Sequence, residues 1–273
     1  MEESMKRLVV GECIIQNIFN LADPDVPMEA EFELMVVKAL TCLYKEYQCF
    51  RFTGGFAYED DCFRPDLALV AKDFSHWFVI EVELVSHSLE QHVLPQVRAF
   101  RYGEPLLDCS VILARELGLD IGRAKSLVEF LPRSVVVIAN KHHDLWESKL
   151  QALAIQYLTV SSYHTSAGLE AIELSGQLNV LKENLGFGTY SSIDRSIRFT
   201  ANTRLPDGQV QITDPTGNSG AWNVVRESGI TWVTKELGTP DIEDQSFLQL
   251  IRSHDGRLVL KKPVSGRSRG MDG

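Results

Sequence analysis

Hydrophobic residues in the first 165 positions recur at helix spacing in some segments and at strand spacing in others. Over residues 28–47 apolar side chains return every three or four positions, which predicts an amphipathic helix. Pro27 favours a helix start here because proline fixes φ and suits the first helical turn. Residues 49–56 fit a strand, and an acidic loop over residues 58–61 follows it. These segments predict a mixed α/β domain.

Two hydrophobic runs between residues 64 and 84 predict a pair of antiparallel strands joined by a turn at residues 72–75. Asp66 begins the first run, and Glu81 and Glu83 end the second. Carboxylates on strands that are otherwise apolar are costly unless they are paired or bind a metal. The turn brings Asp66 near both glutamates. We therefore expect a cluster of hard oxygen ligands of the kind that holds Mg²⁺.

The remaining elements of this first part alternate between helix and strand. Residues 8–19 alternate weakly and fit either a short strand or an entry helix. The other expected elements are a helix over 88–102 with an N-cap at 86–88, a helix over 111–130 with a weak point at 117–118, a buried strand over 134–139, a helix over 146–155 and a strand over 158–163.

Composition changes after about Gly176, where short β-runs are separated by turn signals. The expected strands are 209–213, 221–226, 230–235, 247–251 and 257–261. We therefore divide the chain into residues 1–176, a small β-rich domain at 177–262, built as an antiparallel barrel or sandwich, and a Gly/Ser/Arg-rich tail at 263–273 that we expect to be disordered.

Charge and composition narrow the class of protein. With 37 acidic and 27 basic residues the net charge is −10, which argues against broad attraction to nucleic acid or an anionic membrane but allows a local basic groove. No run approaches the ~20 apolar residues of a membrane span, and the N-terminus lacks a signal-peptide pattern. The five cysteines show no metal spacing and are expected to be buried free thiols. We expect a soluble cytoplasmic protein with no membrane partner.

The acidic cluster carries a resemblance. Pro65 and Asp66, fourteen intervening residues, and then Glu81-Val82-Glu83 stand in an expected α-β-β-β-α-β order. This pattern resembles the PD-(D/E)xK nuclease superfamily. The resemblance covers roughly residues 28–165. It implies an α/β fold with a restriction-endonuclease-like αβββαβ core, to which this chain adds its smaller C-terminal all-β module.

The resemblance also implies roles for individual residues. Asp66 and Glu81 match the acidic residues that bind the divalent metal in this superfamily, and the Val82 carbonyl matches its backbone ligand. The implied cofactor is Mg²⁺, with Mn²⁺ as a substitute. Such an ion stabilises the charge that develops on the phosphate and acidifies the attacking water. The structural alternatives are a turn residue after proline for Asp66 and an outward-facing edge residue for Glu81.

Glu83 departs from the pattern, because the superfamily usually has a lysine two residues after the glutamate. Side chains alternate along a strand, so Glu83 should lie beside Glu81. It could act as a general base or as a further metal ligand. It could equally mark a domain that has kept the fold and lost the chemistry.

Helix residues supply further candidates. Glu33, within Phe32–Val36 and before Leu40, resembles the glutamate of the superfamily's first helix; Glu29 and a solvated acidic first turn are the alternatives. Gln96, followed by aromatic residues, resembles a glutamine that RecB-like nucleases place near the metal; a plain surface glutamine is the alternative. Two histidines, His87 and His92, flank the expected site, and either could assist protonation.

Three functions follow as hypotheses. The first is an Mg²⁺-dependent DNA endonuclease, an endodeoxyribonuclease that hydrolyses phosphodiester bonds. The second is a catalytically inactive nuclease-fold module for nucleic-acid binding or complex assembly. The third is a nuclease subunit of a prokaryotic antiviral defence system, in which the C-terminal β-module would mediate homo-oligomerisation or docking to a partner protein.

Overall fold

The computed structural model describes residues 6–10, 18–25, 27–199, 203, 205, 207–238, 240–253 and 255–262. The chain divides into two compact units, Met1–Val180 and Leu181–Gly273. The boundary expected from composition lay four residues earlier, after residue 176. The tail expected to be disordered, 263–273, lies outside the described residues, as do the positions 11–17 of the weakly alternating N-terminal stretch.

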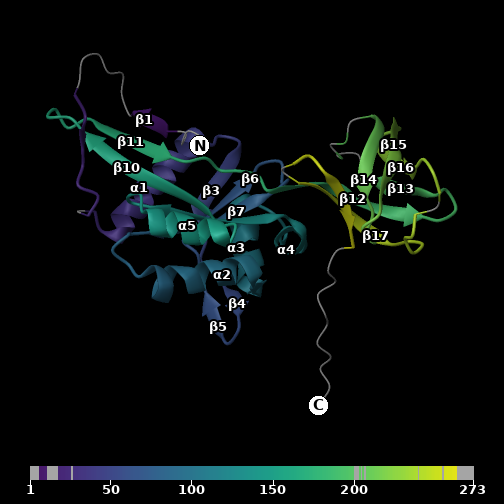
Figure 1. Ribbon diagram of the computed structural model, residues 1–273, viewed down its shortest axis with the longest axis horizontal. Coiled ribbons are helices and arrows are strands. Elements are labelled where there is room, and N and C mark those ends of the chain that lie inside the picture. Colours follow the sequence, from purple (N-terminus) through teal and green to yellow (C-terminus); the bar gives the residue numbers. More distant parts are fainter. Residues whose placement is uncertain are drawn as a thin grey trace. The chain divides into compact units, whose positions relative to one another are not determined.

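The first unit is built on a mixed sheet, which has eight strands among the described residues (Figure 1). Its order is β1-β11-β10-β9-β7-β6-β3, and β2 pairs with β10. These strands are β1 (Lys6–Val10), β2 (Asn20–Leu21), β3 (Tyr47–Arg51), β6 (Leu67–Ala71), β7 (Trp77–Glu83), β9 (Arg133–Ala139), β10 (Gln156–His164) and β11 (Glu170–Ser175). Strands β3, β6 and β7 form an antiparallel meander, and β9 runs parallel to β7. The predicted strand pair at residues 64–84 is confirmed.

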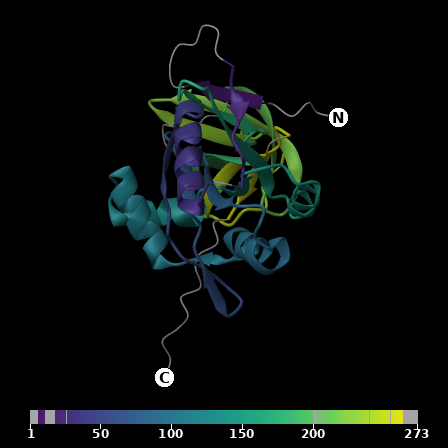
Figure 2. The same ribbon diagram turned by 90° about the vertical axis from the view of Figure 1, so that its left-hand side faces the viewer.

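Helices cover both faces of this sheet. On one face lies α1 (Glu29–Leu43), whose Phe32, Val36 and Leu40 pack in the same core as Phe78, Ile80 and Val82 of β7. Figure 2 shows α1 side-on, in purple. The other face is covered by the π-helical turn η1 (Leu89–Val93), α2 (Leu94–Tyr102), α3 (Leu107–Leu117), α4 (Ile121–Phe130) and α5 (Asp144–Ala152).

This layering decides where the candidate acids point. Trp77 and Val79 belong to the core beneath η1 and α2, whereas Phe78, Ile80 and Val82 belong to the α1 side. Because side chains alternate along a strand, Glu81 and Glu83 continue onto the η1 and α2 face.

Several sequence expectations needed correction. The first helix ends at Leu43 and not near residue 47, because Tyr47 already pairs with Ala71 in β3. The expected acidic loop is a hairpin of β4 (Phe56–Tyr58) and β5 (Asp61–Phe63), which β8 (Glu104–Pro105) extends to a small sheet. The helix expected over 111–130 is two helices, separated at Gly118, whose φ is +64°.

The second unit is a closed barrel of seven described strands. They are β12 (Lys182–Ser191), β13 (Ser196–Phe199), β14 (Gly208–Thr213), β15 (Ser219–Glu227), β16 (Ile230–Lys235), β17 (Phe247–Ser253) and β18 (Leu258–Lys261). The five strands expected from sequence are present, and β12 and β13 were missed. The expectation of a wholly antiparallel module is wrong, because β14 and β18 pair in parallel. Trp222, Tyr190 and Phe199 are buried in its core.

The burial of the cysteines and the length of the helices bear on two further expectations. Of the four cysteines in the described residues, all are free, but only Cys109 is buried, which corrects the expectation for Cys42 and Cys62. Within the part of the chain that the structure describes, no helix combines the length and apolarity that a membrane crossing requires.

Candidate functional site

Asp66 lies across from Glu81 at one end of the strand pair. The β6–β7 ladder pairs Leu67 with Ile80, so continuing the antiparallel register by one residue places Asp66 opposite Glu81. The Asp66 carboxylate accepts a hydrogen bond of 2.8 Å from the backbone amide of Val82. The three positions that the sequence assigned to a metal are therefore adjacent in the structure.

Glu81 is the most constrained of these acids. Its exposed fraction is 3 %, and its Oε2 has no hydrogen-bond partner among the described residues. Burial raises its pKa well above the usual range, and the charges of Asp66 and Glu83 raise it further. A buried carboxylate oxygen without a donor is destabilising unless it is protonated or binds a cation. Hard carboxylate oxygens are the donors that Mg²⁺ and Mn²⁺ accept, so the residues fit such an ion.

Asp66 responds to the same surroundings. Burial raises its pKa to about 7, against the opposing effect of the Val82 amide, and the charges of Glu33 and Glu83 raise it as well. Adjacent buried acids whose pKa values are both raised are typical of functional sites.

Glu33 and Glu29 of α1 act electrostatically on this pair. Both raise the pKa of Asp66 and Glu81 through their charge. Glu33 is largely buried and forms an ion pair of 2.5 Å with Arg51 of β3, whereas Glu29 is exposed. The structure therefore brings both helix candidates near the cluster, with Glu33 as the more enclosed of the two.

Glu83 is held by two histidines. Its exposed fraction is 1 %, and its two oxygens lie 2.6 Å from Nδ1 of His87 and 2.9 Å from Nε2 of His92. Burial raises the pKa of Glu83, whereas the hydrogen bond from His87 and the charge of His92 lower it. The sequence placed these histidines only at the flanks. The sequence signal that could have linked the histidines to Glu83 is their spacing. His87 lies four residues after Glu83, and His92 lies five residues after His87.

Gln96 of α2 shares this face. Its side chain is partly buried, and its Oε1 has no hydrogen-bond partner among the described residues. Arg101, in the last turn of α2, makes its hydrogen bonds outside the acid cluster. It donates to the carbonyls of Leu153 and, at 2.7 Å, Ala154, so it closes the end of α5 and does not contact the cluster.

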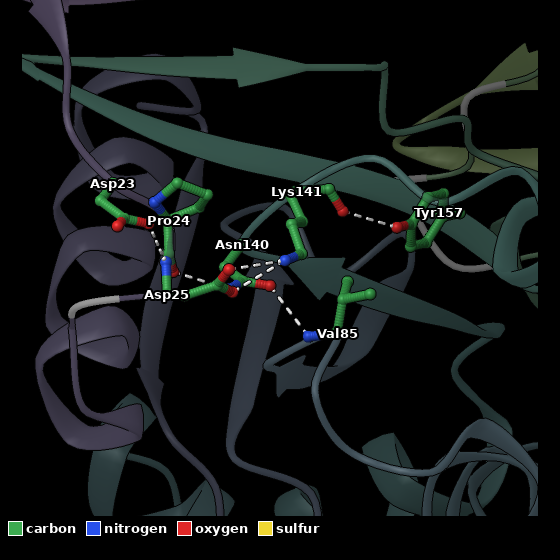
Figure 3. A network of polar contacts seen from close by, with 7 residues as sticks. All are labelled: Asp23, Pro24, Asp25, Val85, Asn140, Lys141 and Tyr157. Carbon is green, nitrogen blue, oxygen red and sulfur yellow. Dashed lines mark hydrogen bonds and ion pairs between the residues drawn. The ribbon is translucent and has the colours of Figure 1, made fainter.

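Asn140, which the sequence did not single out, fixes the loop after β7 (Figure 3). It directly follows β9 and is buried. Its Oδ1 accepts a hydrogen bond of 2.9 Å from the Val85 amide, and its Nδ2 donates one of 2.8 Å to the Pro24 carbonyl. Next to it, Lys141 forms an ion pair of 2.8 Å with Asp25. This network ties the chain before α1 to the segment that carries Glu83 and the histidines.

A cleft of about 560 Å³ lies beside this network. Its lining includes Phe32, Asn140, Lys141, His142 and Tyr157. The acids of the cluster do not line it, so it adjoins the candidate site through Asn140 and is not the site itself.

No protein-family model, no curated protein and no solved structure matches this chain at a significant level. The functional argument therefore rests on the residues and their arrangement.

Proposed function

We propose that this protein is a divalent-metal-dependent DNA endonuclease of the PD-(D/E)xK type. One observation carries the proposal: buried Glu81, one of whose oxygens has no partner among the described residues, lies across from Asp66, whose pKa is raised to about 7. Such a pair is suited to a cation. When the small sheet of β4, β5 and β8, the turn η1 and the helices α3 and α4 are set aside, the order α1, β3, β6, β7, α2, β9 matches the order that the resemblance implies, and it supports the proposal.

The residues have distinct roles in this proposal. Asp66, Glu81 and the Val82 carbonyl would hold Mg²⁺ or Mn²⁺. When bound, the ion would acidify the attacking water and stabilise the charge on the phosphodiester. Asp66 is oriented by the Val82 amide. Glu33, restrained by Arg51, is an outer carboxylate, and Gln96 of α2 has a buried amide oxygen with no partner among the described residues.

Glu83 is less suited to direct proton abstraction than to organising its neighbours. Both of its oxygens already lie within hydrogen-bond distance of an imidazole nitrogen. A general base needs a lone pair within reach of the proton that it removes. Of the two roles that the sequence left open, the geometry argues against the general base.

The competing function is a binding or assembly module without cleavage. It is favoured by the glutamate at position 83, where the resemblance implies a lysine. The C-terminal barrel would then supply the contact to a second copy or a partner protein, as it would in a defence complex.

Plasmid cleavage tests the proposal. Purified protein is incubated with supercoiled DNA and Mg²⁺ or Mn²⁺, with single-stranded DNA and RNA as further substrates. We expect nicked and linear products from wild type and from Asp60→Asn, an exposed acid in the β4–β5 turn. Loss of at least about 100-fold is expected in Asp66→Asn and Glu81→Gln. Equal cleavage by these variants, or no cleavage by wild type although Mg²⁺ binds, would refute the nuclease and support the binding module.

A further inference from the structure

We propose that Glu83, His87 and His92 form a second metal site, which takes a first-row transition-metal cation such as Zn²⁺, Co²⁺ or Mn²⁺. It is distinct from the carboxylate site of Asp66 and Glu81. It does not rest on the nuclease proposal, because it is argued from the donor atoms of these three residues alone.

The fold brings the donor atoms of the three residues close together. One ligand atom from each residue lies within 4.8 Å of the other two. The contacts of Glu83 with the two imidazoles, 2.6 Å and 2.9 Å, are slightly shorter than the roughly 3–3.5 Å that separates ligands around an ion with bonds of ~2.1 Å. The 2.6 Å contact is made by Oε2 and the 2.9 Å contact by Oε1, so an ion shared by all three residues would require the Glu83 carboxylate to turn one oxygen toward both rings. The two rings stand at 86° to each other, so they do not block one another.

The donor set selects the metal. Two imidazole nitrogens and one carboxylate suit Zn²⁺, Co²⁺, Mn²⁺ or Fe²⁺, whereas Mg²⁺ and Ca²⁺ prefer oxygen ligands alone. Three protein ligands leave at least one position for water or substrate. Glu83 is buried, while His87 and His92 are 35 % and 50 % exposed, so the ion would have a path from solvent.

The local backbone is built to hold this arrangement. His92 lies in η1, where the Val93 amide reaches the Ser88 carbonyl at 3.4 Å, the five-residue step of a π-turn. Ser88 also caps the turn, since its Oγ accepts from the Gln91 amide. Such turns are rare and frequently lie at functional sites. The Asn140 bond to Val85 restrains the chain between Glu83 and His87.

The site also accounts for the acid at position 83. A carboxylate on a buried strand needs a positive partner. A divalent cation held by Glu83 would supply positive charge beside Glu81, at the position where the resemblance implies a lysine. This last consequence alone depends on the proposed nuclease function.

Cobalt spectroscopy tests the site on the full chain. Metal-free protein is titrated with Co²⁺, and binding is followed by visible d–d absorption and by calorimetry. We expect one equivalent with this signature, at least tenfold weaker binding in His92→Ala and His87→Ala, and no change in His164→Ala, an exposed histidine of β10. Asp66→Asn should keep the signal, since it removes only the carboxylate site.

A variant that gains a new absorption band distinguishes the loss of a ligand from misfolding. His92→Cys should bind Co²⁺ with a thiolate charge-transfer band that His164→Cys lacks. Unchanged affinity in both histidine-to-alanine variants, or a signal lost in Asp66→Asn, would overturn the site. Because the readout is binding, the site can fail while plasmid cleavage persists, and cleavage can fail while cobalt still binds.

Discussion

The Asp66 carboxylate accepts a hydrogen bond of 2.8 Å from the backbone amide of Val82. This contact joins two segments that are separated by a turn, and it sets Asp66 opposite Glu81. It also turns one Asp66 oxygen toward the backbone of β7, which leaves the other for a ligand.

Stability of the metal-free protein should fall with rising pH. The pKa of Asp66 is about 7 in the folded protein and near 3.8 when unfolded. Between these values the unfolded chain has lost the proton and the folded protein retains it, so the free energy of unfolding decreases as pH rises from about 4 to about 7. Glu81 acts in the same direction. Chemical denaturation across this range measures the effect.

Asp66→Asn should remove part of this slope. The variant should be more stable than wild type at pH 8 by a few kcal/mol, on the order of the full linkage energy for a shift of this size. Asp60→Asn should follow the wild-type curve, because that acid is exposed. Parallel profiles for wild type and Asp66→Asn would show that Asp66 ionises normally.

Divalent ions should stabilise the protein more at high pH. Binding at Asp66 and Glu81 requires both carboxylates to lose their protons, so ion binding competes with proton binding. We expect the Tm to rise with millimolar Mg²⁺, which prefers oxygen ligands alone, at pH 8 and to change little at pH 5. The shift should be absent from Glu81→Gln and retained in Glu129→Gln, an exposed glutamate of α4. Equal shifts at both pH values would contradict binding by these acids.

The positive charge of the Arg51 side chain should reduce the affinity of the Asp66–Glu81 site for a metal ion. Its guanidinium pairs with Glu33 at 2.5 Å, and Glu33 acts electrostatically on Asp66. Arg51→Gln removes this positive charge, so Mg²⁺ affinity measured by calorimetry should rise by a few fold. Stability should change by no more than about 1 kcal/mol, because Arg51 is mostly exposed. A loss of affinity would mean that the ion pair instead positions Glu33 as a required ligand.

Asn140 should matter for stability and for the site. Asn140→Ala leaves the Val85 amide and the Pro24 carbonyl without their partner, which should cost about 1–3 kcal/mol in a denaturant titration. Asn140→Asp keeps an acceptor for Val85 but offers no donor to Pro24. If the loop positions Glu83 and the histidines, Asn140→Asp should retain more Co²⁺ affinity than Asn140→Ala. If Asn140→Asp instead loses more Co²⁺ affinity than Asn140→Ala, the hydrogen bond to Pro24 is the one that restrains the loop.

Elements with strong local patterns were predictable from the sequence. The strands β6 and β7 follow from two apolar runs around a polar turn, and α1 follows from Phe32, Val36 and Leu40 at helical spacing. The hairpin β4–β5 and strand β11 were missed because their sequences are short or mixed in polarity. The place of these strands in the sheets is decided by pairing: β4 pairs with β8, and β11 pairs with β10 and β1.

The sequence by itself determined which acids could form a site: Asp66, Glu81 and Glu83 stand at the ends of apolar strands, where a carboxylate has few structural uses. Only the tertiary structure decided the surroundings of each acid. Within the described part of the chain, one Glu81 oxygen has no partner, whereas Glu83 contacts His87 and His92. The reason is physical: spacing along a strand fixes the face of a side chain, but its partners come from a π-turn and from loops tied by Asn140, whose contacts span up to 116 residues.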